Sequence, residues 1–170
     1  MQYINKLVLL LEAIKRDDIT EVIAAITSAN NVFTAGNGGS ATTAQHFAQG
    51  LWANGIRAHC LSDNIAVITA IANDFGYEKI FERQLAINAT KLDLLICISV
   101  SGNSSNLLRA TEYANEHQIP TIGILGNDGG KLKDLVKKAI IVNSPDYQLV
   151  EDAHLSITHI ITKNLQVAEW

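Results

Sequence analysis

Two short loops of this sequence carry residue types that bind an anion. Gly36-Asn37-Gly38-Gly39-Ser40 follows an apolar run at 31–35 and precedes a stretch with helical spacing at 40–53. Ser99-Val100-Ser101-Gly102-Asn103-Ser104-Ser105 follows a second apolar run and again precedes a helical stretch. The first N–H groups of a helix are unpaired and lie at the positive end of its dipole, so both loops predict a phosphate-binding turn.

The residue types in these loops limit the class of ligand that they could bind. Neither loop contains Lys or Arg, so backbone N–H groups, hydroxyls and helix dipoles would hold the anion. The P-loop and G-x-G-x-x-G patterns are absent, which disfavours a nucleotide. Helix capping and hydroxyl turns would account for one or two of the serines, and a tight turn for the glycines. Four hydroxyls within seven residues exceed that need, and we therefore favour a phosphate site.

Alternating elements must position these loops. Apolar runs rich in β-branched residues predict strands at 31–35, 57–61, 93–99, 121–125 and 139–142. Helical spacing predicts helices at 40–53, 64–72, 78–88 and 106–117. This alternation predicts an α/β fold, a three-layer αβα sandwich around a five-stranded parallel sheet. Ligands of such sheets bind where loops leave the carboxyl ends of strands, and both loops do so.

The two ends of the chain read as helical. Apolar stripes predict two short helices in the region 1–30, on either side of Asp17-Asp18, and these stripes would serve an oligomer. Ser144-Pro145-Asp146 interrupts the chain after the sheet core at 31–143, and one long helix is predicted at 147–169. No linker or repeat divides the sequence, so we expect a single domain over 1–170.

Bulk composition limits the function classes. The chain has 170 residues, 48% hydrophobic and 18% charged, with a net charge of −4, as in globular proteins. No basic cluster supports direct nucleic-acid or anionic-membrane binding. Cys60 and Cys97 sit in apolar runs, which predicts buried, reduced thiols. Without a signal-peptide or membrane-spanning pattern, we expect a cytoplasmic protein.

The loops and several further motifs resemble the SIS (sugar isomerase) domain family, with its flavodoxin-like fold, and most of all its phosphoheptose isomerases. The matching segments are Gly36-Asn37-Gly38-Gly39-Ser40-Ala41, Ala44-Gln45-His46-Phe47-Ala48, Thr69-Ala70-Ile71-Ala72-Asn73-Asp74-Phe75-Gly76-Tyr77-Glu78, Ile98-Ser99-Val100-Ser101-Gly102-Asn103-Ser104, Gly129-Gly130 and His159. The resemblance implies a phosphorylated sugar as ligand and a homo-oligomer, dimer or tetramer, whose sites form between subunits. With Ser40 from the first loop, it implies a substrate site lined by Asn37, Gly38, Gly39, Asn73, Asp74, Ser99, Val100, Ser101 and Ser104.

The departures from the family concern its catalytic residues. The isomerases carry a glutamate four residues after the histidine equivalent to His46, and here that residue is Gly50. Where the family usually has a glutamine eight residues before its catalytic histidine, this chain has Glu151 before His159. The region 51–62 is shorter, which removes an arginine-bearing loop, and the N-terminal helical region is truncated. We therefore predict that Glu151 replaces the lost base and acts with His159 as a catalytic residue of a rearranged site, and that His46, Glu151 and His159 are the candidate ligands for the zinc found in some members.

Each candidate also has an ordinary structural explanation. His46 would be a hydrogen-bonded core histidine, and Glu151 would stabilise a helix N-terminus. Two functions therefore remain. The first is aldose–ketose isomerisation through an enediol, which needs a base near the carbon acid and a group that polarises the carbonyl. The second is a non-catalytic, phosphosugar-binding regulator that acts through a protein partner, similar to the initiator-associating relative of these isomerases, which lacks the same glutamate.

Overall fold

A five-stranded, wholly parallel sheet forms the centre of the computed structural model, which describes residues 1–165. Its strand order is β2-β1-β3-β4-β5, the flavodoxin-like order. The strands are β1 (Val32–Ala35), β2 (Ala58–Cys60), β3 (Leu94–Ser99), β4 (Thr121–Gly126) and β5 (Lys138–Val142). Every residue of β1, β3 and β4 is buried, as expected for strands covered on both faces. The predicted α/β sandwich is confirmed.

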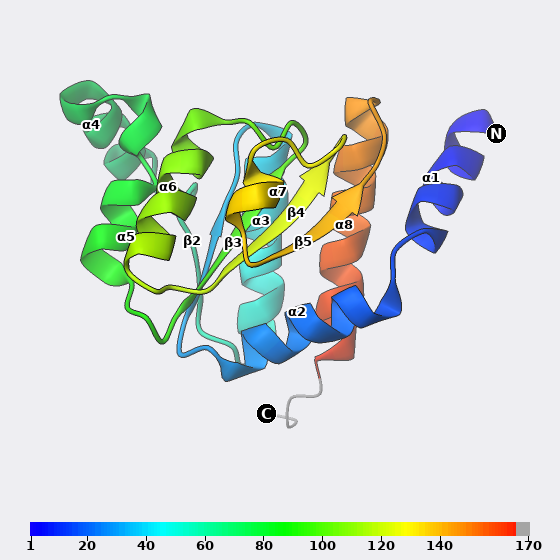
Figure 1. The fold of residues 1–170 in the computed structure, drawn as a ribbon, viewed down its shortest axis with the longest axis horizontal. Helices are drawn as coiled ribbons and strands as arrows, with labels where there is room; N and C mark the ends of the chain where they lie inside the picture. Colours follow the sequence, from blue (N-terminus) through cyan, green and yellow to red (C-terminus); the bar gives the residue numbers. More distant parts are fainter. Residues whose placement is uncertain (166–170) are drawn as a thin grey trace.

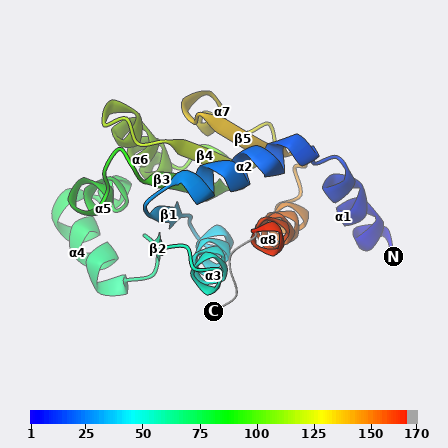
Figure 2. The same cartoon turned by 90° about the horizontal axis from the view of Figure 1, so that it is seen from below.

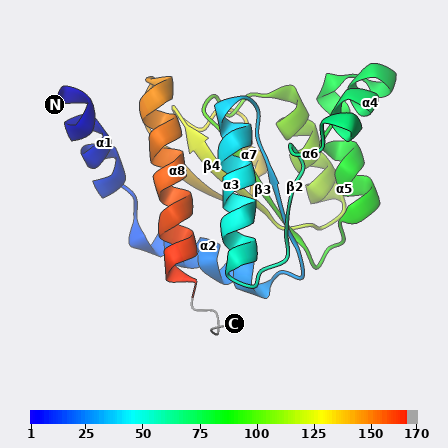
Figure 3. The same cartoon turned by 180° about the vertical axis from the view of Figure 1, so that it is seen from behind.

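Helices cover both faces of the sheet (Figures 1 and 2). On one face, α2 (Arg16–Ser28), α3 (Gly39–Ala53) and α8 (Tyr147–Asn164) share a hydrophobic core with the strands. On the other, α5 (Glu82–Asn88), α6 (Ser105–Glu116) and α7 (Leu132–Leu135) enclose a second core. Figure 3 shows α3 and α8 running side by side on the first face. This pair carries most of the candidate catalytic residues.

Two helices differ from their predicted bounds. The stretch predicted as one helix at 78–88 is a 3-10 turn, η1 (Tyr77–Lys79), followed by α5. Between them Ile80 and Phe81 are each 1% exposed, and the break lets both side chains enter the core. Helix α4 (Ile65–Phe75) runs beyond the predicted end at 72 and stops at Gly76, whose φ of 96° suits glycine. The end of the predicted helix 147–169 lies outside the described residues.

Helices α1 (Gln2–Glu12) and α4 stand at opposite ends of the molecule (Figure 1). Neither contains a buried residue, although both sequences are rich in apolar side chains. Ile65 of α4 is 71% exposed and Leu9 of α1 is 65% exposed. One chain alone therefore leaves two apolar helical surfaces in contact with water.

Both cysteines are buried and free, as predicted. Burial raises the pKa of the Cys97 thiol to about 12, and it raises that of Cys60 as well. Both thiols therefore stay protonated at neutral pH, which suits a packing role. Among the described helices, none has the length and apolar character needed to cross a membrane.

Candidate functional site

The two predicted loops meet in one cavity of about 320 Å³ at the carboxyl ends of β1 and β3. The glycine loop supplies four of the lining residues, the serine loop and the end of β3 supply five, and α8 supplies two. They are Asn37, Gly38, Gly39, Ser40, Ile98, Ser99, Val100, Ser101, Ser104, Tyr147 and Glu151. None of these residues is Lys or Arg, so an anion in this cavity would depend on N–H groups and hydroxyls.

The glycine loop is shaped by its backbone and held by an amide network. Gly38 adopts a φ of 55° as the residue that caps α3 and brings no side chain of its own to the turn. The Asn37 and Asn106 side chains form a reciprocal amide pair, with both N···O distances 2.9 Å. The Tyr77 hydroxyl donates to Asn37 Oδ1 at 2.8 Å. Asn37 is thus fixed from two sides before any ligand binds.

The serine loop divides its hydroxyls between structure and ligand. Ser99 Oγ accepts the N–H of Gly102 at 3.1 Å, and Ser101 Oγ accepts the N–H of Asn103 at 3.2 Å. Both hydroxyls can still donate their O–H to a ligand. Ser104 occupies the N-cap of α6 but makes no side-chain capping bond. Turn formation therefore accounts for two serines, and Ser104 keeps its whole hydrogen-bonding capacity at the cavity wall.

A neighbouring loop after β4 supports the serine loop. Gly102 has a φ of 63°, and a Cβ there would collide with the backbone carbonyl of Gly129. Asn103 Oδ1 accepts the Lys131 N–H at 3.1 Å, and Asn127 donates to the carbonyl of Val100 at 3.2 Å. The Gly129-Gly130 motif thus lies against the phosphate loop and shapes it from outside the cavity.

Glu151 lies in the cavity wall rather than at a helix cap. The N-terminus of α8 is capped by Asp146, whose carboxylate accepts the N–H groups of Gln148 and Leu149 at 3.1 and 3.3 Å. The carboxylate of Glu151, one turn further along, lies against Gly39, where any Cβ would overlap it. Asp146 therefore supplies the cap of α8, and the Glu151 carboxylate is not needed as a capping group.

His46 and His159 form a pair on the outer side of α3 and α8. Their Nε2 atoms are 2.8 Å apart, and the rings meet edge to face with centroids 5.0 Å apart. Both residues are exposed, so His46 is not a core histidine. His159 follows Glu151 by eight residues, which is about 12 Å along a helix. One chain therefore places the carboxylate at the phosphate cavity and the two imidazoles beyond it.

The distance between Glu151 and the two histidines decides whether one chain can form the zinc site that the family implies. A catalytic zinc site needs three protein ligands and an open position. His46 and His159 offer two nitrogens, but residues 1–165 contain no group of three His, Cys, Asp or Glu side chains placed to hold a metal. Glu151 points to Gly39 instead of completing the set. The side-chain arrangement of one chain does not fit a complete zinc site.

Gly50 lies against α8 at the position of the family's glutamate. A Cβ at Gly50 would be 3.0 Å from the γ-methyl group of Thr162. The glycine thus permits close contact between α3 and α8 below the histidine pair. Where the family has a glutamate, α3 and α8 pack closely together at Gly50, and no open space remains there.

Asn73 and Asp74 are the predicted substrate-binding residues that one chain does not bring to the cavity. Both lie near the end of α4 and are exposed, and Asn73 donates to Asp74 Oδ1 at 2.8 Å. Their connection to the site runs through Tyr77, which follows them in sequence and bonds to Asn37. In a single chain, their predicted place on the substrate wall is not formed.

Three participants were missed by sequence reasoning. Tyr147 lines the cavity one turn before Glu151, while Asn106 and Tyr77 hold Asn37. Asn106 is 1% exposed, and a buried asparagine in the first turn after the serine loop is a signal that the sequence offers. His154, one turn after Glu151, is 1% exposed, so its ring lies in the core. Desolvation lowers the pKa of His154 to about 4, so the ring is neutral in the folded protein.

Comparison with known proteins decides the family. The sequence profile of the SIS domain matches residues 2–126. The chain belongs to the SIS domain family. A phosphoheptose isomerase of Helicobacter pylori is 40% identical over 158 residues, covering 89% of this chain and 82% of that protein. Another, from Nitratiruptor, is 42% identical over 145 residues, covering 82% of this chain and 78% of its own length.

Solved structures agree with this SIS assignment. The phosphoheptose isomerase GmhA from Neisseria gonorrhoeae superposes with a TM-score of 0.91 at 27% identity, covering 97% of this chain and 94% of its own. A phosphoheptose isomerase from Francisella tularensis gives a TM-score of 0.89 at 29% identity, covering 95% and 91%. The predicted resemblance is confirmed, and these relatives support a phosphosugar isomerase.

Proposed function

We propose that this protein is an aldose–ketose isomerase acting on a seven-carbon sugar phosphate of the sedoheptulose 7-phosphate type. The observation that carries the proposal is the placement of the Glu151 carboxylate in the same cavity as the serine and glycine loops. A site for phosphate alone would have no use for a carboxylate, because the two negative charges repel each other. A base beside a phosphosugar site is what isomerisation requires.

The phosphate is proposed to bind where α6 begins. Ser104 has a free hydroxyl there, and Ser99 and Ser101 hold their O–H groups available while their oxygens close the turn. The positive end of the α6 dipole replaces the missing Lys and Arg side chains. The phosphate sits on the last carbon, so the sugar carries its reacting C1 and C2 away from the serine loop and towards α8.

Glu151 and His159, which lie about 12 Å apart along α8, are proposed as the acid–base pair, with both side chains turning towards a sugar bound between them. Glu151 removes a proton from C1 of the ketose while His159 donates one to the carbonyl oxygen on C2, which gives the enediol. His159 then takes the proton of the C1 hydroxyl, and Glu151 returns its proton to C2, which gives the aldose. His46, 2.8 Å from His159, orients the ring that donates. No step passes through a metal ion, since one chain does not assemble three ligands for it.

We also propose a homo-oligomer, dimer or tetramer. The apolar surfaces of α1 and α4 are uncovered in one chain, and Asn73 and Asp74 stand outside the cavity on one of them. A second copy packed on α4 would remove that apolar surface from water and enclose these two side chains. Light scattering that reports a monomer at micromolar concentration would contradict this proposal. A cytoplasmic location stays a prediction.

The test of function is turnover and its dependence on the carboxylate. Conversion of sedoheptulose 7-phosphate is followed by NMR with wild type and with Glu151→Gln, which keeps the shape and removes the base. We expect wild type to form the aldose, and the variant to lose at least about 100-fold in rate, the ordinary contribution of a general base. Binding is measured separately, by the thermal midpoint with the sugar phosphate and with the unphosphorylated sugar.

Ser101→Ala combined with Ser104→Ala should abolish the midpoint shift in that binding assay. If wild type binds the sugar phosphate but never converts it, the regulatory function replaces the catalytic one. Equal stabilisation by sugars with and without phosphate would remove the phosphate site itself.

A further inference from the structure

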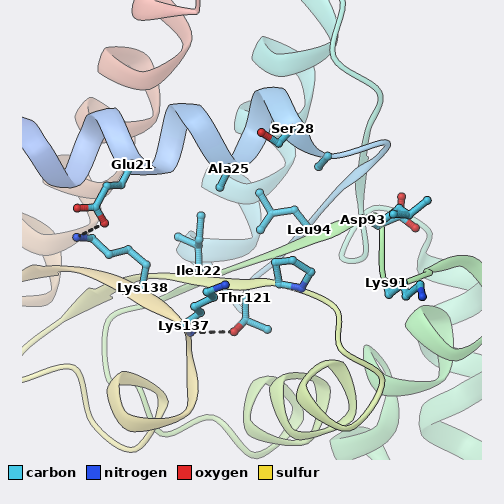
Figure 4. Close-up of a pocket in the computed structure, with 13 residues that line it drawn as sticks. Glu21, Ala25, Ser28, Lys91, Asp93, Leu94, Thr121, Ile122, Lys137 and Lys138 are labelled. Atoms are coloured by element: carbon cyan, nitrogen blue, oxygen red, sulfur yellow. Dashed lines mark hydrogen bonds and ion pairs between the residues drawn. The ribbon is translucent and has the colours of Figure 1, made fainter.

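A second cavity lies at the amino ends of the strands, on the opposite side of the sheet's length from the phosphosugar site. It has a volume of about 450 Å³ and is formed where β3, β4 and β5 begin, beneath the second half of α2 (Figure 4). The phosphosugar cavity lies where β1 and β3 end. The two cavities share no lining residue, so this one has no part in the isomerase site.

The interior of this cavity is apolar. Figure 4 shows Ala25 of α2 facing Leu94 and Ile122 of the sheet across the hollow. Leu94 and Ile122 are 1% and 3% exposed, and they belong to the core shared with α2. Ala25 and Ala29 are short side chains, and the space between helix and sheet stays unfilled where they face it. An apolar ligand body would replace water on Ala25 and Ala29, which are half-buried, and would lie over the buried floor.

The charges around the hollow are not equally available. Lys138 is already paired with Asp18 at 2.8 Å and with Glu21 at 2.7 Å, which ties β5 to α2. Burial disfavours the charged form of Asp93, but hydrogen bonds from Asn31 and Thr90 outweigh it and hold its pKa below the ordinary value. Lys138 is therefore neutralised by its carboxylate partners, whereas Asp93 keeps a negative charge that neutral hydrogen-bond donors stabilise.

Lys91 and Lys137 are different. Both line the cavity and are exposed, and neither makes an ion pair with any residue in the part of the chain that the structure describes. Lys91 lies at one end of the hollow, opposite Lys138 (Figure 4). The cavity thus combines an apolar floor with two lysines whose positive charge is not neutralised.

We propose that this cavity is a second ligand site, which binds a small organic anion with an apolar body, such as an aromatic carboxylate or sulfonate. The body would occupy the space between Ala25, Leu94 and Ile122. The acid group would pair with one of the two lysines, Lys91 at one end of the hollow or Lys137 near the other. A sugar phosphate is hydroxylated along its length and would bury polar groups against this floor, which is unfavourable. The ligand class therefore differs from that of the isomerase site.

The test uses 1-anilinonaphthalene-8-sulfonate, an aromatic sulfonate whose fluorescence rises in apolar sites. Ala25→Leu fills the cavity, and Ala24→Leu places the same side chain on the adjacent, exposed position of α2. We expect wild type and Ala24→Leu to bind the probe equally, and Ala25→Leu to bind about tenfold more weakly because the added side chain overlaps it. Midpoint shifts with sugar phosphate should be the same in all three, which shows that Ala25→Leu is folded.

A second set of variants tests the charges without touching the core. Lys91→Gln and Lys137→Gln together should weaken probe binding about twofold to fivefold, as expected for one exposed ion pair, and raised salt should weaken wild type similarly. Lys6→Gln, an exposed lysine on α1, is the matched control and should bind like wild type. The proposal is overturned if wild type does not bind the probe, or if Ala25→Leu or the double lysine variant binds it as tightly as wild type.

Discussion

Replacing His154 by leucine is expected to remove a pH dependence of stability that the wild-type protein shows between pH 6.5 and 4. His154 lies on the buried face of α8 and is 1% exposed, and desolvation lowers the pKa of its ring from 6.5 to about 4. In this window the unfolded chain binds a proton on His154 that the folded chain does not. The folded state therefore loses stability as the pH falls through 6.5 and stops losing it near pH 4.

The size of this effect follows from the shift. A displacement from 6.5 to about 4 corresponds to about 3 kcal/mol of unfolding free energy. The assay is urea unfolding at several pH values from 7 to 4, with the difference between wild type and His154→Leu taken at each. Carboxylates titrate in both proteins and cancel in the difference. His117→Gln, which alters an exposed histidine stacked on Tyr113, is the control and should follow wild type. A constant difference between wild type and His154→Leu across the whole range would refute the reasoning.

Two further substitutions test the cavity wall and the α3–α8 contact. Asn106→Leu deletes the amide that holds Asn37, and the affinity for the sugar phosphate should fall about tenfold because the Asn37 amide loses its partner. Asn115→Leu on the same helix is the control and should bind normally, so equal affinities in both variants would contradict this role of Asn106. Gly50→Glu should lower the free energy of unfolding by about 1 to 3 kcal/mol through overpacking on Thr162, and adding Thr162→Ala should recover most of the lost stability. A Gly50→Glu protein as stable as wild type in urea would show that α8 does not pack closely against this position.

The sequence contained enough information for the sheet and for the loops that end its strands. Buried strands such as 94–99 are continuous apolar runs, and Gly38 and Ser104 precede helices as their types require. Local pattern could not predict where Ile80 and Phe81 would break a helix, because that depends on the core they enter.

The same limit applies to contacts across elements. The pairing of His46 with His159 depends on how α3 crosses α8, and the pairing of Asn37 with Asn106 on the distance between two loops. The residue spacing within one segment predicts neither of these two side-chain contacts. The place of Glu151 was predicted from a family departure, but its contact with Gly39 needed the fold.

Proton exchange at the reacting carbon tests the central claim most directly. In deuterated buffer, an enediol mechanism places deuterium on the carbon next to the carbonyl of sedoheptulose 7-phosphate or of its aldose product, and NMR detects it even when net turnover is slow. We predict exchange with wild type and none with Glu151→Gln, although the variant still binds the sugar phosphate. Wild-type protein that binds the sugar phosphate yet shows neither exchange nor product, with or without added zinc, would contradict the isomerase function.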